Sequence, residues 1–69
     1  MRIDRSELEA AAVGMTHYER RVAGCLLLNP GITLKGVAEK LSRTHLAVRT
    51  KVSRMKGKFP KIFIHTQPK

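Results

Sequence analysis

The chain has 69 residues, which limits it to one domain, and a chain this short buries only about 60% of its unfolded surface, so little room remains for an enclosed active site. Lysine and arginine number 14 against 5 aspartate and glutamate residues, and the resulting formal charge of +9 favours a polyanionic partner. No apolar run approaches the roughly 18 residues of a membrane span, and residues 1–12 lack the apolar block of a signal peptide. The single cysteine excludes an internal disulfide. We therefore expect a cytoplasmic protein in a reducing compartment.

Residues 1–15 are expected to form either an arm or a short helix. Ser6 and Glu9 have the spacing of a capping box, in which a serine hydroxyl and a glutamate satisfy backbone amides at a helix start. The helix would cover about Glu7–Val13 and end at Gly14.

A second helix is predicted to begin after Thr16, which forms a capping box with Glu19. Its apolar face repeats at helical spacing, and residues 29–31, Asn-Pro-Gly, end it. The face consists of Tyr18, Val22, Cys25, Leu26 and Asn29.

Two shorter helices follow, joined by the turn Ser42-Arg43-Thr44. The first has Thr33 as its N-cap and an apolar stripe at Leu34, Val37, Ala38 and Leu41. The second has Ser42 or Thr44 as its N-cap, runs to about Met55 and stops before Gly57. Its core-facing residues are Val48, Val52 and Met55.

Residues 62–64, Ile-Phe-Ile, change the period and predict a short strand. A strand needs a partner, and the candidates are residues 32–33 or the same segment of a second chain. Folding back over the chain's own core is the favoured arrangement, and a homodimer is the alternative. The expected fold is mainly all-α, with a helix-turn-helix domain at residues 16–57 and a basic extension at 58–69.

The predicted helix over residues 44–55 carries the candidate binding face. Because one side is core, the opposite side presents Leu46, Thr50 and Ser53, with Arg49 at its flank. No acidic residue lies beyond Glu39, so this end of the chain is uniformly basic. The residues suited to phosphate contacts are Lys35, Arg43, Lys51, Arg54, Lys56 and Lys58.

Residues 41–51, LSRTHLAVRTK, resemble the L-G-R-T-x-x-A-V-R-x-K pattern of small bacterial and phage helix-turn-helix proteins of the homeodomain-like and Myb-like type. Residues 29–41, NPGITLKGVAEKL, resemble the N-P-G-I-T-L-x-x-I-A-x-x-L segment of many bacterial regulators, winged ones included. The chain departs from the pattern at Ser42, where glycine is usual, and it lacks a second strand for a full wing. The resemblance implies a nucleoid-associated bacterial or phage regulator, with base contacts from Thr44, His45, Leu46, Arg49, Thr50 and Ser53.

The sequence therefore predicts a transcriptional regulator that binds duplex DNA with the helix at 44–55 in the major groove. Two alternatives stay open: a module that binds a protein of the transcription machinery, and an architectural protein that binds DNA without sequence preference. We expect no enzyme, cofactor or metal, because His17, His45 and His65 have no ligand spacing and no nucleophile has a partnered base. A membrane partner is not expected either, because the apolar faces are needed for the core.

Overall fold

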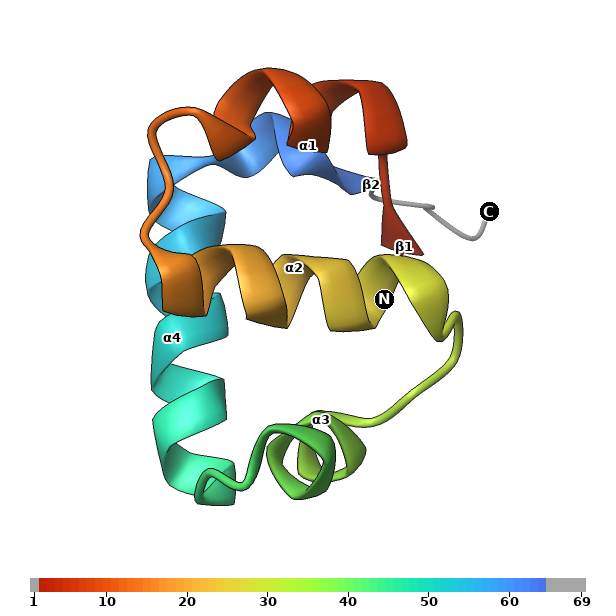
Figure 1. Ribbon diagram of the computed structural model, residues 1–69, viewed down its shortest axis with the longest axis vertical. Coiled ribbons are helices and arrows are strands. Elements are labelled where there is room, and N and C mark those ends of the chain that lie inside the picture. Colours follow the sequence, from red (N-terminus) through yellow and green to blue (C-terminus); the bar gives the residue numbers. More distant parts are fainter. Residues whose placement is uncertain (1, 65–69) are drawn as a thin grey trace, which may run out of the picture.

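A computed structural model of the chain describes residues 2–64, so residues 65–69 of the expected basic extension, with His65, lie outside the described residues. The fold is mainly helical, as predicted, with a short antiparallel pair of strands (Figure 1). The elements are β1 (Arg2–Ile3), α1 (Arg5–Ala12), α2 (His17–Leu28), α3 (Leu34–Leu41), α4 (His45–Lys58), the 3-10 turn η1 (Pro60–Ile62) and β2 (Phe63–Ile64).

The predicted starts of α2, α3 and α4 are confirmed, and each begins with a threonine cap. Thr16 and Glu19 form the complete capping box: the Thr16 amide donates to Glu19 Oε1 at 2.8 Å, and the Glu19 amide donates to Thr16 Oγ1 at 3.2 Å. The hydroxyls of Thr33 and Thr44 accept from the amides three residues on, at 3.0 and 3.1 Å. These bonds satisfy amides that a helix start leaves without partners.

Two predicted helix boundaries are wrong. Helix α1 begins earlier than Glu7, because Asp4 and not Ser6 is the N-cap: its carboxylate accepts from the Glu7 amide at 3.2 Å. Helix α4 continues through Gly57 to Lys58. Its end is set instead by Pro60, which disfavours a helical conformation at Phe59 (φ −129°, ψ 62°).

Helices α1, α2 and α3 follow one another down the long axis of the molecule, and α4 runs along that axis past the N-terminal end of α2 (Figure 1). The side chains that these helices turn inward form one hydrophobic cluster with β1, η1 and β2. The buried members are Ile3, Leu8, Met15, Val22, Ala23, Leu26, Val37, Ala38, Val48, Val52, Met55, Ile62 and Phe63. Cys25, predicted to be a core residue, is partly buried and packs against this cluster.

The predicted strand at residues 62–64 is present only over Phe63–Ile64, because Ile62 belongs to η1. Within the chain its partner is not residues 32–33 but β1, in the register Arg2↔Ile64 and Ile3↔Phe63. The Asp4 amide extends the pairing by donating to the Ile62 carbonyl at 2.8 Å. This pairing lets Ile62 and Phe63 enter the chain's own core, the arrangement that the sequence favoured.

The turn between α3 and α4 is tight and depends on a left-handed residue. Ser42 has φ 56° and ψ 44°, a conformation that favours glycine and costs other residues roughly 1–2 kcal/mol. The Arg43 amide donates to the Ala38 carbonyl at 2.9 Å and closes the end of α3. The serine at the position where the resembled pattern has glycine thus keeps the glycine-type conformation.

Candidate nucleic-acid interface

The inner face of α4 is fixed by three side chains that point into the core. Val48, Val52 and Met55 are 0%, 2% and 0% exposed, as the spacing predicted. A helix held this firmly along one side has little freedom to rotate, so its opposite side is presented in a defined orientation. Helix α3 packs closely against α4, with Ala38 buried, and so it fixes the direction of α4 as well.

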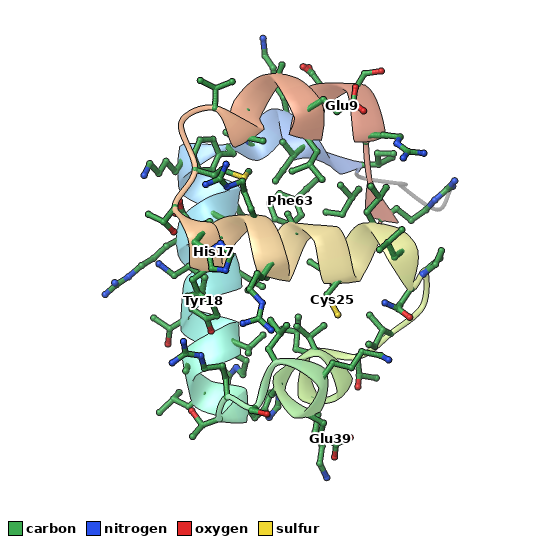
Figure 2. All side chains as sticks on the ribbon, viewed as in Figure 1. Glu9, His17, Tyr18, Cys25, Glu39 and Phe63 are labelled. Carbon is green, nitrogen blue, oxygen red and sulfur yellow. The ribbon has the colours of Figure 1, made fainter. Side chains whose placement is uncertain are left out.

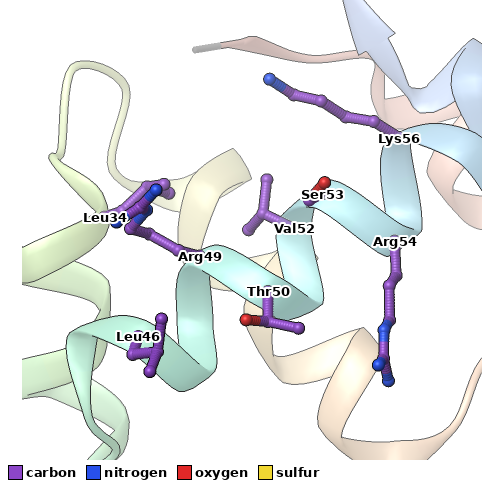
Figure 3. A pocket seen from close by; sticks show the side chains of 8 residues that line it. All are labelled: Leu34, Leu46, Arg49, Thr50, Val52, Ser53, Arg54 and Lys56. Atoms are coloured by element: carbon purple, nitrogen blue, oxygen red, sulfur yellow. The ribbon is translucent and has the colours of Figure 1, made fainter.

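A shallow, open groove of about 430 Å³ follows the outer side of α4. In Figure 3 the Arg49 side chain extends toward Leu34 of α3, whereas Arg54 extends away in another direction. Cationic, hydroxyl and apolar groups thus all contribute to the lining of the groove. The groove is lined by Leu34, Leu46, Arg49, Thr50, Val52, Ser53, Arg54 and Lys56.

The structure brings four of the six residues predicted for base contacts into this groove: Leu46, Arg49, Thr50 and Ser53. All four are exposed, and Leu46 keeps 67% of its surface accessible; Val13 and Leu28, which do not line the groove, are exposed to 91% and 76%. The other two lie at the start of α4. Thr44 uses its hydroxyl oxygen to cap the helix, and His45 is exposed in the first turn.

The six predicted phosphate-contacting residues divide into separate groups. Arg54 and Lys56 line the groove. Arg43 and Lys51 lie over the ring of Tyr18, 4.9 and 5.6 Å from its centroid. Lys35 is exposed in the first turn of α3 and does not line the groove.

Lys58, the remaining predicted phosphate contact, is held at the far end of α4. Its Nζ lies 3.9 Å from Glu19 Oε2 and 5.2 Å from the centroid of Phe59. The hydrogen bond from the Thr16 amide is the largest cause that lowers the pKa of Glu19 below its ordinary value of 4.5; Lys58 and Lys51 lower it further, against burial, which raises it. Glu19 is therefore an ionised, buried partner that draws Lys58 toward the body of the fold.

Two residues at this surface have a position that sequence reasoning did not assign. Tyr18 and Leu34 were both predicted as members of apolar stripes, but each is only partly buried. Leu34 forms part of the groove wall, and Tyr18 supports two cations. The signal for Tyr18 was its place at the first turn of a helix, where a long aromatic side chain extends past the core to the neighbouring helix.

None of the helices within residues 2–64 has the length and apolar character that crossing a bilayer requires. The same residues contain no group of three or more histidine, cysteine or carboxylate side chains placed to hold a metal ion. Comparisons of the chain with family models, with curated proteins and with solved structures found no match.

Proposed function

We propose that this protein binds duplex DNA and that α4 enters the major groove. The observation that carries the proposal is the face of α4 described above, where Arg49, Thr50 and Ser53 line one groove on a helix whose other side is fixed in the core. An α-helix fits the major groove, and a helix-turn-helix unit presents its second helix there. No acidic residue follows Glu39 in the sequence, so nothing on α4 repels phosphate.

The groove residues suit different parts of the duplex. Arg49 can form a bidentate pair with guanine, the commonest specific contact in the major groove, and Leu46 can contact a thymine methyl group. The hydroxyls of Thr50 and Ser53 can donate or accept, so they tolerate several bases. Arg54 and Lys56 border these residues and are placed for phosphates, which fix the helix in the groove.

The test is fluorescence anisotropy of labelled duplex DNA across a salt series, with a site first selected from a random pool. The logarithm of the affinity should fall linearly with the logarithm of the salt concentration, because bound phosphates release counterions. Absence of binding at low salt, or a salt-independent affinity, would refute the proposal.

Arg49→Ala tests whether the binding is specific for sequence. It should weaken the selected site by about 1–3 kcal/mol and leave random duplex much less affected. Arg5→Ala is the matched control, since Arg5 is an exposed arginine of α1 whose ion pair with Glu9 lies at the surface. If Arg49→Ala weakened all duplexes equally, the protein would be an architectural DNA binder.

A protein partner is the second candidate, and the exposure of Leu46 is the observation that favours it. Leu46 lies in the first turn of α4 beside the polar groove residues Arg49 and Thr50, where a protein partner could bury its apolar surface. The test is binding of the nuclease-treated protein to purified RNA polymerase. Binding that Leu46→Asp abolishes would support this function over DNA binding, provided that the wild type shows no affinity for duplex DNA.

A further inference from the structure

The ring of Tyr18 is a meeting point of three elements. Tyr18 lies in the first turn of α2, Arg43 in the turn between α3 and α4, and Lys51 at the middle of α4. The guanidinium carbon of Arg43 is 4.9 Å and the ammonium nitrogen of Lys51 5.6 Å from the ring centroid. Figure 2 shows Tyr18 at the end of α2 that crosses α4. Both distances are within the range of cation–π attraction, so the ring attracts both positive groups.

The hydroxyl of Tyr18 has no hydrogen-bond partner among residues 2–64, although its oxygen is buried. A buried polar group without a partner costs about 1–3 kcal/mol, and buried tyrosine hydroxyls usually have one. The rest of the ring packs partly against the core. The hydroxyl is thus a donor without an acceptor, on a ring that two cations contact.

The two cations are also left without a close acid. Within the described part of the chain, no carboxylate lies within ion-pair distance of Arg43 or Lys51. The charge of Lys51 helps to lower the pKa of Glu19, but the Glu19 carboxylate accepts from the Thr16 amide and lies 3.9 Å from Lys58 Nζ. Arg43 is exposed and Lys51 is partly buried, so both cations can take an anionic partner from solution.

We propose that Tyr18, Arg43 and Lys51 form a phosphate site that clamps the DNA backbone beside α4. The proposal rests on the proposed function, and it adds a residue of α2 to the interface. A backbone phosphate pairs with the two cationic head groups and draws them off the ring, which opens access to the buried Tyr18 hydroxyl and lets the phosphate accept its hydrogen. Charge-assisted bonds of this kind are roughly twice as strong as neutral ones.

The clamp would also set how α4 is oriented in the major groove of the duplex. Arg49 and Leu34 mark the side of α4 that faces α3, whereas Lys51 projects toward Tyr18 of α2. A helix in the major groove has a phosphate strand along each side. The Tyr18 site therefore engages the strand on the α2 side, and Arg49 faces the other strand.

Tyr18→Phe separates a binding role from a structural one. The variant keeps the ring and both cation contacts but removes the buried hydroxyl. Its thermal stability should be equal to or above that of the wild type, because an unsatisfied group is lost. Its affinity for the selected duplex should nevertheless fall by about 3- to 10-fold, with an unchanged salt slope. Equal affinity of the two proteins would overturn the proposal.

Lys51→Met tests the charge of the site, and Lys61→Met is its control. Both variants remove one lysine charge, but Lys61 is exposed in η1, apart from α4. Lys51→Met should lower the slope of log affinity against log salt by about 1, whereas Lys61→Met should change it little. Equal decreases in the two variants would mean that net charge alone matters and would overturn the site.

Tyr18 is the chain's one tyrosine and no tryptophan is present, so its emission reports directly on this site. Short duplex should change that emission saturably in the wild type and much less in Lys51→Met. Inorganic phosphate is the second probe. If free phosphate changes the Tyr18 emission saturably and Tyr18→Phe binds duplex as tightly as the wild type, the site binds a small anion and the DNA clamp is overturned. If the wild type binds duplex but no Tyr18-site variant matters, the clamp alone fails; if it binds no duplex, the proposed function fails too.

Discussion

At the scale of single residues, Glu19 joins two ends of the fold. Its carboxylate accepts from the Thr16 amide at the start of α2 and lies 3.9 Å from Lys58 at the end of α4. The side chain of Glu19 is 6% exposed, whereas that of Lys58 is 58% exposed. Because the acid is buried and the lysine is not, the contribution of the pair depends mainly on keeping Glu19 ionised.

This predicts a loss of stability in acid that depends on Glu19. The pKa of Glu19 is lower in the folded chain than its ordinary value of 4.5, chiefly because of the Thr16 amide and then the lysines. The stabilisation is therefore full above that value and is lost as pH falls through the folded pKa. Glu19→Gln keeps the capping geometry but not the charge, so its thermal midpoint should fall less than that of the wild type between about pH 6 and pH 3.

The matched control is Glu39→Gln, which neutralises an exposed carboxylate of α3. Its acid profile should follow that of the wild type. Parallel profiles for the wild type and Glu19→Gln would show that Glu19 contributes no pH-dependent stability.

At the scale of helices, two glycines inside α3 and α4 differ in what surrounds them. A Cβ at Gly57 would have no heavy atom within 4 Å, whereas a Cβ at Gly36 would lie 2.9 Å from Ile32 Cγ1 and 3.3 Å from its Cδ1. Ile32 packs partly against the core, so it is not free to move away. Gly36 thus admits a close approach of the α2–α3 connection, and Gly57 has no such role.

Gly57→Ala should therefore stabilise the fold, while Gly36→Ala should not. Glycine within a helix costs roughly 0.5–1 kcal/mol relative to alanine, and Gly57→Ala should recover that amount. At Gly36 the clash offsets the gain, so we expect no stabilisation or a net loss. Chemical denaturation measures both, and a stabilising Gly36→Ala would show that helix propensity outweighs the contact with Ile32.

The helix starts were predictable because each depends on neighbours in the sequence. Thr16, Thr33 and Thr44 cap amides three residues away, and such contacts need no knowledge of the fold. The start of α1 was assigned to the wrong residue because Asp4 and Ser6 are both competent caps, and β1 pairing places Asp4 at the helix start. The length of α4 was underestimated because the prediction ended it before Gly57, whereas glycine disfavours a helix much less than proline does and the helix continues until Pro60 prevents it.

Contacts between distant segments were beyond reach of the sequence pattern. Residues 2–3 gave no strand signal, since a two-residue strand has no periodicity to detect. The outer face of α4 was predictable from its inner face, but the approach of Tyr18 to Lys51 depends on how α2 crosses α4. The candidate groove thus follows from local spacing, and the Tyr18 site follows only from the packing of three elements.

At the scale of the whole molecule, the β1–β2 pair and the proposed binding face of α4 differ in burial, although Lys56 of the groove lies 6.0 Å from the ring centroid of Phe63 in β2. The β1–β2 pair joins the first and last described segments, and Ile3 there is only 7% exposed. The groove lies on the outer side of α4, where Leu46 is 67% exposed. Substitutions at these two residues should therefore have separable effects.

Ile3→Ala should destabilise the fold by about 2 kcal/mol, the low end for a buried isoleucine because its strand lies at the protein surface. At temperatures where the variant stays folded, its duplex affinity should equal that of the wild type, since α4 keeps its own anchors, Val48 and Val52.

Leu46→Ala should do the reverse: its stability should change by less than about 0.5 kcal/mol, while affinity for the selected duplex should fall about 3-fold or more as an apolar contact is lost. Denaturation and anisotropy on the same samples measure both quantities. If Ile3→Ala weakened binding in the fully folded state, the two ends would be coupled, and α4 would depend on β1 for its orientation.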